Sequence, residues 1–358
     1  MRASRNTMTA AMAAVLLTAS AAPAFAAGKD VFRAAGLSVG PGQVASGFIE
    51  VPAGADPATR IPVTIINGAR PGKVLALVAG VHGYEYPPIL ALHRVKQQLD
   101  PAKLSGTVIM VHIANLPSFQ RRTIYYNPHD WKNLNRVFPG DLQGTQSQRI
   151  AALLTAEVVD RADILIDLHC GDGNEALIPY TYWMQSKSEK LNQETKRLAA
   201  AFGLRHIIID DTRTQDVRDS RYLGNTAILR GKPAVTTESG YLGRTDEESV
   251  EANVRGIMNV MRLYGMVPGS PQRLPEPVWI DRYEVVNSPA DGLFRAEAGM
   301  GYYVTEGQVV GVISDYFGET LEEVRAPFTG ILLYVLGTPP CNKGEPLFEV
   351  GRVVGGKK

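Results

Sequence analysis

An apolar run at residues 73–78 ends in Gly80, and the chain then turns into a helical pattern that begins at Pro88. Such an uninterrupted run predicts a strand that is buried on both faces of a sheet. The turn contains His82 and Glu85, which can supply an imidazole nitrogen and a carboxylate to one zinc ion. The pair alone is also typical of turn residues that bond to backbone, so a metal site requires a third ligand.

Strand and helix patterns alternate along most of the chain. Strands are predicted at residues 47–52, 61–66, 106–113, 163–169, 206–210 and 233–238, and helices at 88–99, 146–159, 191–201, 222–229 and 246–264. This alternation predicts an α/β fold with a mostly parallel mixed sheet that is flanked by helices on both faces. Thr245 and Glu248 have the spacing of a capping box at the start of the last helix.

The first residues have the pattern of a secretory signal peptide, which we place at residues 1–26. Residues 1–5 are positively charged, residues 8–22 are apolar, and Ala24 and Ala26 are small residues next to a cleavage site. The apolar region is shorter than the roughly 20 residues that cross a bilayer, so an uncleaved anchor is the lesser alternative. We therefore expect a periplasmic or secreted protein without a membrane span.

Length and charge restrict the class of partner. With 358 residues and a hydrophobic fraction of 45%, the chain is long enough for two domains and a sizeable core. Its formal net charge of +1 argues against a nucleic-acid partner, because phosphate binding generally needs a basic surface. A small-molecule substrate fits better, and the sequence leaves a homo-oligomer open.

A proline-rich segment at residues 267–277 predicts a linker. It separates a predicted catalytic domain at residues 27–266 from a C-terminal domain at residues 278–358. In this second part, period-two patterns and glycine turns replace the strand and helix alternation, which predicts an all-β domain.

Further polar residues stand at predicted strand ends. His169 ends the strand at 163–169 and supplies the third ligand candidate, beside His82 and Glu85. Three protein ligands leave a fourth position for water, as in catalytic zinc sites. Hydrolysis also needs a group that takes the proton of that water, and Glu238 at the end of another strand is the candidate general base. We therefore predict one Zn²⁺ per chain.

A long polar loop at residues 118–144 is typical of a functional segment. Within it, Arg136 can bind a substrate carboxylate through two hydrogen bonds, and Asn135 can add another. A salt bridge that stabilises the loop is an equal alternative for this pair. His129 in the same loop is a candidate for substrate contact. Asp167 could orient a ligand histidine through its other ring nitrogen, or it could cap the strand end.

The remaining histidines and the cysteines carry no predicted chemistry. His93 lies in a predicted helix and His112 and His206 lie in predicted strands, where a histidine is usually packed or hydrogen-bonded. Cys170 follows a candidate ligand and Cys341 belongs to the C-terminal part. Export would permit one disulfide, but we expect two unpaired, buried thiols.

Four motifs, in this order, resemble the succinylglutamate desuccinylase/aspartoacylase family, a branch of the zinc carboxypeptidase superfamily. The motifs are Gly80-Val81-His82-Gly83-Tyr84-Glu85, Asn133-Leu134-Asn135-Arg136-Val137-Phe138-Pro139-Gly140, Asp167-Leu168-His169 and Thr237-Glu238-Ser239-Gly240. The resemblance covers nearly all of the mature chain and implies a zinc carboxypeptidase-like fold. It also implies that His82, Glu85 and His169 bind zinc, that Asn135 and Arg136 hold a substrate carboxylate, and that Glu238 is the general base.

Two positions depart from the family pattern. Relatives usually carry an arginine before the Asn-Pro-x-Asp segment, where it can polarise the scissile carbonyl, whereas this chain has Tyr125 and Tyr126. Either Arg121 or Arg122 then takes over this contact, or the contact is altered. The family also commonly has Asp at the position of Asn133, so the substrate is less well defined by the resemblance than the metal.

The C-terminal part resembles the barrel-sandwich hybrid of biotinyl and lipoyl carriers. The segment that would present the modified lysine, residues 318–323, contains no lysine, so a carrier function does not follow. We expect this part to form a wall of the active-site entrance or an oligomer contact. Tyr302, Tyr303 and Tyr316 are candidates for substrate contact.

Together these patterns predict an exported zinc-dependent hydrolase that cleaves the amide bond of an N-acyl amino acid or a similar small acylated amine. Metal-activated water would attack the amide, with a glutamate as general base. The first alternative is a zinc carboxypeptidase that acts on peptides or cell-wall fragments. The second is a non-catalytic metal- or ligand-binding protein of the same fold, although pure binding has no need of Glu238.

Overall fold

The structure is a computed structural model that describes residues 30–272 and 275–355. The predicted signal peptide at residues 1–26 lies outside the described residues. Within the described ranges, no helix is both long enough and apolar enough to cross a membrane.

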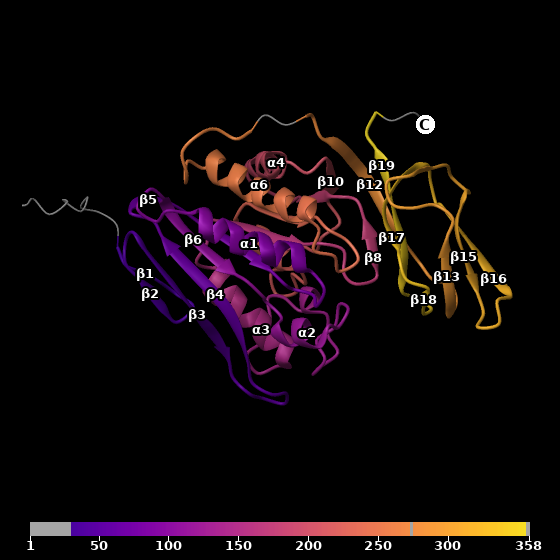
Figure 1. The fold of residues 1–358 in the computed structure, drawn as a ribbon, viewed down its shortest axis with the longest axis horizontal. Coiled ribbons are helices and arrows are strands. Elements are labelled where there is room, and N and C mark those ends of the chain that lie inside the picture. The colour runs from indigo at the N-terminus through magenta and orange to yellow at the C-terminus, as the bar shows by residue number, and fades with distance from the viewer. Residues whose placement is uncertain (1–29, 273–274, 356–358) are drawn as a thin grey trace, which may run out of the picture.

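A 13-stranded mixed sheet extends through the molecule (Figure 1). In sheet order its strands are β14 (Tyr303–Val304), β17 (Gly330–Leu336), β19 (Pro346–Val353), β12 (Val278–Asn287), β10 (His206–Asp210), β9 (Tyr180–Met184), β11 (Ala234–Glu238), β7 (Ile164–His169), β5 (Arg70–Ala79), β6 (Ser105–Val111), β4 (Thr59–Asn67) and β3 (Gln43–Val51), and β8 (Glu175–Leu177) pairs with β17. The central strands β11, β7, β5 and β6 are parallel, whereas β4 and β3 are antiparallel to their neighbours. The predicted mixed α/β sheet is confirmed.

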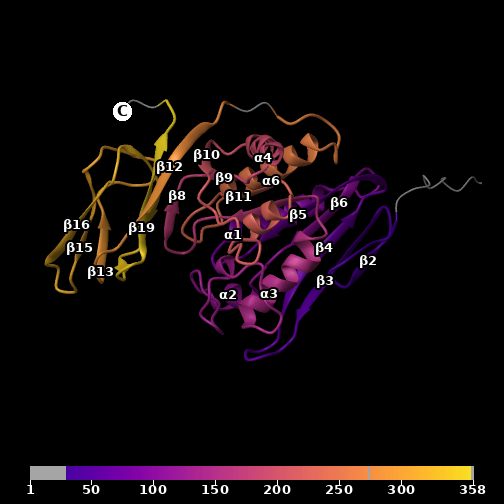
Figure 2. The same ribbon diagram turned by 180° about the vertical axis from the view of Figure 1, so that it is seen from behind.

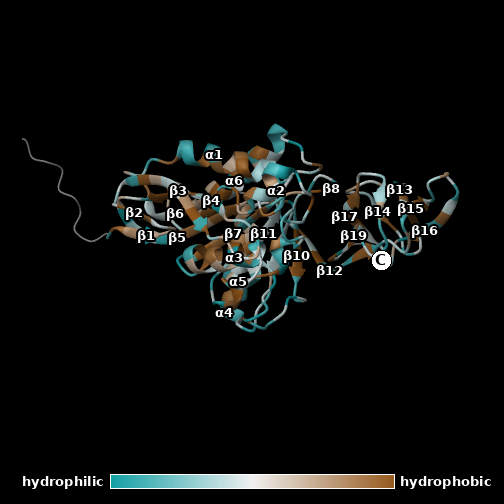
Figure 3. Ribbon diagram, turned by 90° about the horizontal axis from the view of Figure 1, so that it is seen from below, coloured by the Kyte–Doolittle hydropathy of each residue, from teal (hydrophilic) through white to brown (hydrophobic). Residues whose placement is uncertain are grey.

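Helices cover both faces of the central strands (Figures 1 and 2). One face packs against α1 (Tyr86–Gln98), α4 (Glu189–Phe202) and α6 (Glu247–Leu263), and the other against α3 (Gln146–Leu154), its π-helical continuation at Thr155–Val159, and α5 (Leu223–Leu229). In β5, Leu75 and Leu77 pack in the hydrophobic core beneath α1, α4 and α6, and Ala76 and Val78 pack in the core beneath α3 and α5. Both faces of this strand are therefore buried, which explains its uninterrupted apolar run. Hydrophobic and hydrophilic colours mix along the helices in Figure 3, as expected for elements with one buried side.

Helix α6 begins one residue later than the sequence predicts. Its N-cap is Asp246, whose Oδ1 accepts hydrogen bonds from the backbone N–H and the hydroxyl of Ser249, at 3.0 and 2.7 Å. The predicted capping box of Thr245 and Glu248 is therefore wrong. Aspartate is as good an N-cap as threonine or better, so the two positions competed and spacing alone did not decide between them.

The long loop between β6 and α3 contains two short helices, α2 (Leu116–Arg121) and the 3₁₀ turn η1 (Leu134–Arg136). At the start of the described chain, β1 (Phe32–Ala34) and β2 (Leu37–Val39) form a small hairpin. The predicted linker lies between α6 and β12, and its described part runs past α4 at the top of Figure 1.

The C-terminal β region, residues 278–355, continues the main sheet. Strand β12 pairs in parallel with β10 and antiparallel with β19, and β8 pairs with β17. A second, four-stranded antiparallel sheet consists of β16 (Thr320–Arg325), β15 (Val309–Ser314), β13 (Gly292–Ala296) and β18 (Pro340–Cys341). The two sheets enclose a separate hydrophobic core. The region is antiparallel β as predicted, and its strand pairing fixes it beside the ends of the central strands.

The cysteines behave as predicted from the sequence. Cys170 and Cys341 are both buried and unpaired. Burial raises the pKa of the Cys170 thiol well above its usual range, so this group is a protonated, weakly reactive thiol.

Candidate metal centre

His82, Glu85 and His169 come together at one end of the central strands. The first two lie in the turn between β5 and α1, and His169 is the last residue of β7, which runs parallel to β5. Nδ1 of His82 and Nδ1 of His169 lie 2.7 and 2.8 Å from Oε1 of Glu85. The three ligand atoms all lie within 4.8 Å of one another. The structure thus gathers the whole predicted ligand set at one point.

Two glycines shape the turn that carries two of these ligands. Gly80 has a φ of +68°, a left-handed conformation that glycine adopts without strain. A Cβ atom on Gly83 would lie 2.3 Å from the carbonyl oxygen of Thr123. The loop after α2 therefore packs directly against the backbone between His82 and Glu85, and a side chain at Gly83 would displace the ligands.

The outer nitrogens of both imidazoles are also held. Nε2 of His169 lies 2.9 Å from Oδ1 of Asp167, and Nε2 of His82 lies 3.1 Å from Oδ1 of Asn133. Both partners are oxygen acceptors, and the shorter contact of His169 is to Asp167 and not to Nδ2 of Asn135 at 3.2 Å, so a proton on each Nε2 satisfies the oxygens and leaves each Nδ1 as the metal-binding atom. Such outer partners are typical of histidine ligands of zinc. The donor set and its tautomers therefore fit zinc.

The charges of the centre also favour a cation. Burial raises the pKa of the Glu85 carboxyl, but His169 and His82 outweigh burial and hold this pKa below its usual range. Burial lowers the pKa of His169, whereas Asp167 and Glu85 raise it well above the usual value. The carboxylates thus attract positive charge to the two imidazoles. A metal ion satisfies the same attraction when it replaces the ring protons.

Glu238 lies next to the ligands with a free carboxylate oxygen. It is the last residue of β11 and pairs in register with His169 on β7. Its Oε2 is buried and has no hydrogen-bond partner among the described residues. Burial raises the pKa of this carboxyl well above its usual range. A carboxyl group whose pKa is raised takes up a proton more readily than an exposed glutamate does, as a general base requires.

The centre opens into a cavity of about 190 Å³ at the junction with the C-terminal β region. That region supplies Val285, Tyr334, Pro346 and Glu349 to its wall. The remaining lining residues are His82, Glu85, Tyr125, Asn133, Asn135, Arg136, His169, Glu175, Leu177, Tyr180, Tyr182, Met184, Arg213, Tyr222, Thr236 and Glu238. The C-terminal region therefore forms part of the wall around the metal centre.

Known proteins are similar to this chain along most of its length. Residues 71–264 match the family described as the succinylglutamate desuccinylase/aspartoacylase catalytic domain. The chain is also 32% identical, over 324 residues, to N-alpha-acetyl-L-2,4-diaminobutyric acid deacetylase from Halomonas elongata, with 87% of this chain and 92% of the relative covered. The chain belongs to the succinylglutamate desuccinylase/aspartoacylase family.

Solved structures of the succinylglutamate desuccinylase/aspartoacylase family share the fold. A protein of this type from Rhodobacter sphaeroides superposes with a TM-score of 0.77 at 27% identity, covering 87% of this chain and 96% of its own. The product-bound ectoine utilization protein EutE (DoeB) from Ruegeria pomeroyi gives a TM-score of 0.77 at 26% identity, covering 86% and 95%. The similarity therefore extends beyond the residues that match the catalytic-domain family.

In this member of the succinylglutamate desuccinylase/aspartoacylase family, Asn135 and Arg136 differ in how free they are. Oδ1 of Asn135 accepts a hydrogen bond of 2.8 Å from the backbone N–H of Leu223, and its Nδ2 lies 3.2 Å from Nε2 of His169. The exposed Arg136 donates to the carbonyl oxygen of Asn135, and its guanidinium lies 4.7 Å from the centre of the Tyr222 ring. Asn135 is thus engaged in positioning the site, whereas Arg136 keeps donors available for a substrate.

Three residues that the sequence singled out lie away from the cavity. Arg121, Arg122 and His129 are exposed, and none of them lines the cavity. The arginines that do line it are Arg136 and Arg213. The geometry therefore does not support a role of Arg121 or Arg122 at the scissile carbonyl or a substrate contact by His129.

Tyr125, at the position where the family resemblance predicts an arginine, takes a structural role. Its hydroxyl donates to Oε1 of Glu175 at 2.9 Å, and its backbone N–H donates to Oδ2 of Asp172 at 2.8 Å. Both acceptors lie in the segment after β7. Tyr125 therefore ties the long loop to the strand that supplies His169, while it also lines the cavity.

Arg213 was missed by the sequence analysis. It follows β10, forms an ion pair with the buried Asp210, and stacks on the rings of Tyr222 and Tyr182 at 3.9 and 5.3 Å. Asp210 ends a predicted strand, as His169 and Glu238 do, and this position was a signal that could have drawn attention to the arginine after it.

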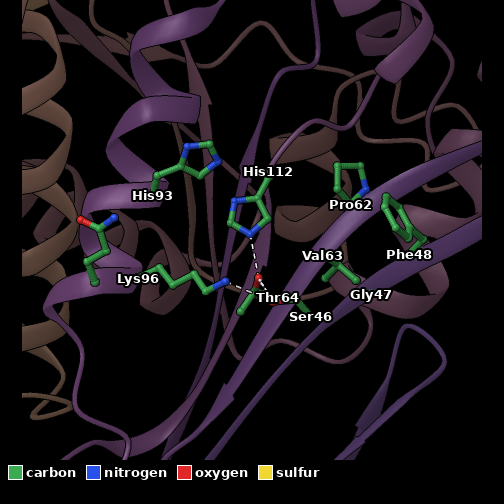
Figure 4. Close-up of a pocket in the computed structure, with 10 residues that line it drawn as sticks. Ser46, Gly47, Phe48, Pro62, Val63, Thr64, His93, Lys96 and His112 are labelled. Carbon is green, nitrogen blue, oxygen red and sulfur yellow. Dashed lines mark hydrogen bonds between the residues drawn. The ribbon is translucent and has the colours of Figure 1, made fainter.

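Outside the metal centre, a cavity of about 580 Å³ lies between α1 and strands β3 and β4 (Figure 4). The rings of His93 and His112 are 5.3 Å apart there, and Nε2 of His112 lies 2.8 Å from Oγ1 of Thr64. Burial lowers the pKa of His112 to about 4, so its ring is neutral. Although this cavity is larger, no carboxylate lines it, so it lacks the groups for metal-assisted hydrolysis.

Proposed function

We propose that this protein is an exported, zinc-dependent deacylase that hydrolyses the amide bond of small N-acyl amino acids. The observation that carries the proposal is the His82, Glu85 and His169 triad, with the unpartnered carboxylate oxygen of Glu238 on the neighbouring strand. A non-catalytic binding protein would need the triad but not the buried, free carboxylate.

The residues of the triad and its surroundings would have three different roles in the reaction: metal binding, proton transfer and substrate binding. Zinc bound by His82, Glu85 and His169 would lower the pKa of a water molecule and polarise the substrate carbonyl. Glu238 would take the proton from the water and deliver it to the leaving nitrogen, which its raised pKa favours. Arg136, exposed at the cavity wall, would bind the substrate carboxylate through its guanidinium.

A small substrate is supported by the cavity and by the curated relative. A volume of about 190 Å³, closed on one side by the C-terminal β region, suits an acylated amino acid better than a peptide. The relative from Halomonas elongata is a deacetylase of N-alpha-acetyl-L-2,4-diaminobutyric acid, which makes this compound the first substrate to try. Hydrolysis of peptides or cell-wall fragments remains the alternative.

The decisive experiment measures amine release by the zinc-loaded protein, expressed from residue 27 onward. The panel contains Nα-acetyl amino acids with basic, neutral and acidic side chains, together with short peptides that end in the same amino acids. We expect turnover of the acetyl amino acids, no turnover after chelation, and recovery on adding zinc. Release from the peptides alone would establish the carboxypeptidase alternative, and release from neither class would refute hydrolysis at this site.

Export is a separate proposal that rests on the pattern of residues 1–26. Fractionation of cells that express the full chain, followed by N-terminal sequencing, is its test. We expect a mature protein in the periplasm or medium that begins near Ala27. A full-length chain in the cytoplasm would contradict export and leave the deacylase proposal intact.

A further inference from the structure

A buried carboxylate in the C-terminal β region lines the cavity, and one of its two oxygens has no hydrogen-bond partner among the described residues. Glu349 lies in β19, between buried apolar neighbours, and its side chain lines the cavity although it is only 4% exposed. Its Oε1 has no hydrogen-bond partner within residues 30–272 and 275–355. A carboxyl group buried in this way destabilises the fold unless something else pairs with it.

The charges around Glu349 favour the binding of a cation over that of an anion. Glu175, from the segment after β7, faces the same cavity, and its carboxylate accepts hydrogen bonds from the Tyr125 hydroxyl and the Asp172 backbone N–H. The nearby Arg213 is already paired with Asp210. Burial, and then repulsion from Glu175, raise the pKa of Glu349 to about 8. Arg213 and a hydrogen bond with the Tyr182 side chain oppose this rise, and the charge of Asp210 adds to it.

We propose that Glu349 and Glu175 form a binding subsite for a cationic group, an ammonium on the side chain of the amino-acid half of the substrate. An ammonium between them would satisfy Oε1 of Glu349 and offset the repulsion between the two carboxyl groups. An acidic side chain would place another negative charge beside them. The subsite therefore selects acylated diamino acids over acylated aspartate or glutamate, the amino acids that the description of this family names.

The subsite spans the junction between the two parts of the fold. Glu175 pairs through β8 with Leu336 of β17, and Glu349 pairs with Tyr334 of the same strand. Strand β17 thus fixes the separation of the two carboxyl groups, which preorganises them for a ligand. The C-terminal β region then contributes to substrate selection, in addition to closing the cavity.

The test compares three acetylated substrates of nearly equal size. Nα-acetyl-L-2,4-diaminobutyrate carries the ammonium, Nα-acetyl-L-norvaline replaces it by a methyl group, and Nα-acetyl-L-homoserine replaces it by an uncharged hydroxyl. The zinc-loaded enzyme, Glu349→Gln and the control Glu284→Gln are compared by kcat/KM, zinc content and thermal unfolding. Glu284 is an exposed carboxylate on the adjacent strand β12, so its variant matches the charge change outside the cavity.

The wild-type protein and Glu284→Gln should prefer the diaminobutyrate derivative, by roughly 10- to 100-fold over the norvaline derivative, as expected for a charge-assisted hydrogen bond. In Glu349→Gln this ratio should fall close to one, mainly through KM, with zinc retained. Equal losses for all three substrates would overturn the subsite and assign Glu349 a purely structural role. A wild-type preference for the homoserine derivative would show a subsite for uncharged polar groups instead.

The kinetic test rests on the proposed deacylase function, because it needs a substrate that is hydrolysed. A binding measurement tests the subsite separately from that function. Calorimetric titration with L-2,4-diaminobutyrate and L-norvaline requires no turnover. Tighter binding of the diamino acid by the wild-type protein than by Glu349→Gln, with proton release that depends on Glu349, supports the subsite even if no substrate is hydrolysed. Equal binding of both amino acids would refute the subsite even if deacylation is found.

Discussion

The two walls of the cavity differ in how the side chains other than the candidate base Glu238 are paired. On the side formed by the ends of β5 and β7, both nitrogens of His82 and of His169 lie within hydrogen-bond distance of oxygen acceptors. On the side formed by β19, Oε1 of Glu349 is buried and has no hydrogen-bond partner in the part of the chain that the structure describes. The first wall has a donor set that fits a metal ion, whereas the second has a buried carboxylate oxygen that the proposed ligand would pair. Chemistry and selection are thus supplied by different parts of the fold.

The largest effect is expected from removing a ligand on the metal wall. His169→Ala should lose zinc and with it all measurable turnover, because two protein ligands bind zinc far more weakly than three. Elemental analysis after dialysis measures the metal directly. Full zinc occupancy in this variant would contradict the assigned ligand set. His206→Ala, which changes a histidine outside the cavity, is the matched control.

Glu238→Gln separates the metal from the proton transfer. The variant should keep its zinc, since Glu238 is not in the proposed ligand set. Its kcat should fall by roughly 100- to 10,000-fold because the glutamine side chain cannot take up the proton from water. Metal content and steady-state kinetics on one substrate check both statements. A rate near that of the wild-type protein would remove Glu238 from the mechanism.

Asp167→Asn examines whether the metal wall depends on its outer partners. An amide can still accept from Nε2 of His169 but carries no charge, so zinc affinity should fall by roughly 10- to 100-fold. Competition with a chelator of known affinity measures the change. Unchanged affinity would mean that the pairing seen around the imidazoles is structural and does not tune the metal.

The sequence predicted that His82, Glu85 and His169 come together, because two of the strands involved end at these residues or just before them. His169 and Glu238 each end an apolar run, and parallel strands bring such ends to one edge of the sheet, so order along the chain was enough. The fold followed from the same alternation of strands and helices. Two details were not predictable: which residue caps α6, and whether the side chain of Asn135 is available to a substrate. Each depends on which of several possible hydrogen bonds forms in the folded protein, and a linear pattern does not rank them.

The second wall was not predictable for a different reason. Glu349 belongs to a period-two β pattern in which its neighbours face a separate core. Nothing local indicates that its side chain reaches the candidate metal centre, whose ligand His82 lies 267 residues earlier in the chain. Arg213 likewise depends on the packing of Tyr222 and Tyr182. These positions follow from how β12 joins the C-terminal region to β10, which is a long-range pairing. Tyr302, Tyr303 and Tyr316, which the sequence did suggest, are exposed and do not line the cavity.

The smallest effect is expected on the stability of the unpaired wall. The pKa of Glu349 is raised to about 8 in the folded protein, so its contribution to stability is complete at acidic pH and is lost as the pH rises from its ordinary value of about 4.5 through 8. Glu349→Gln removes this loss, and its free energy of unfolding relative to the wild-type protein should therefore rise between pH 5 and pH 8, by up to about 3 kcal/mol. Denaturant unfolding at both pH values, with Glu284→Gln as control, measures this difference. A variant that is less stable than the wild-type protein at pH 8 would show that contacts within the fold stabilise the Glu349 carboxylate. The two walls would then not differ in how their polar groups are paired. A more stable variant that has lost its preference for diamino acids would show that this wall gives up stability for selection.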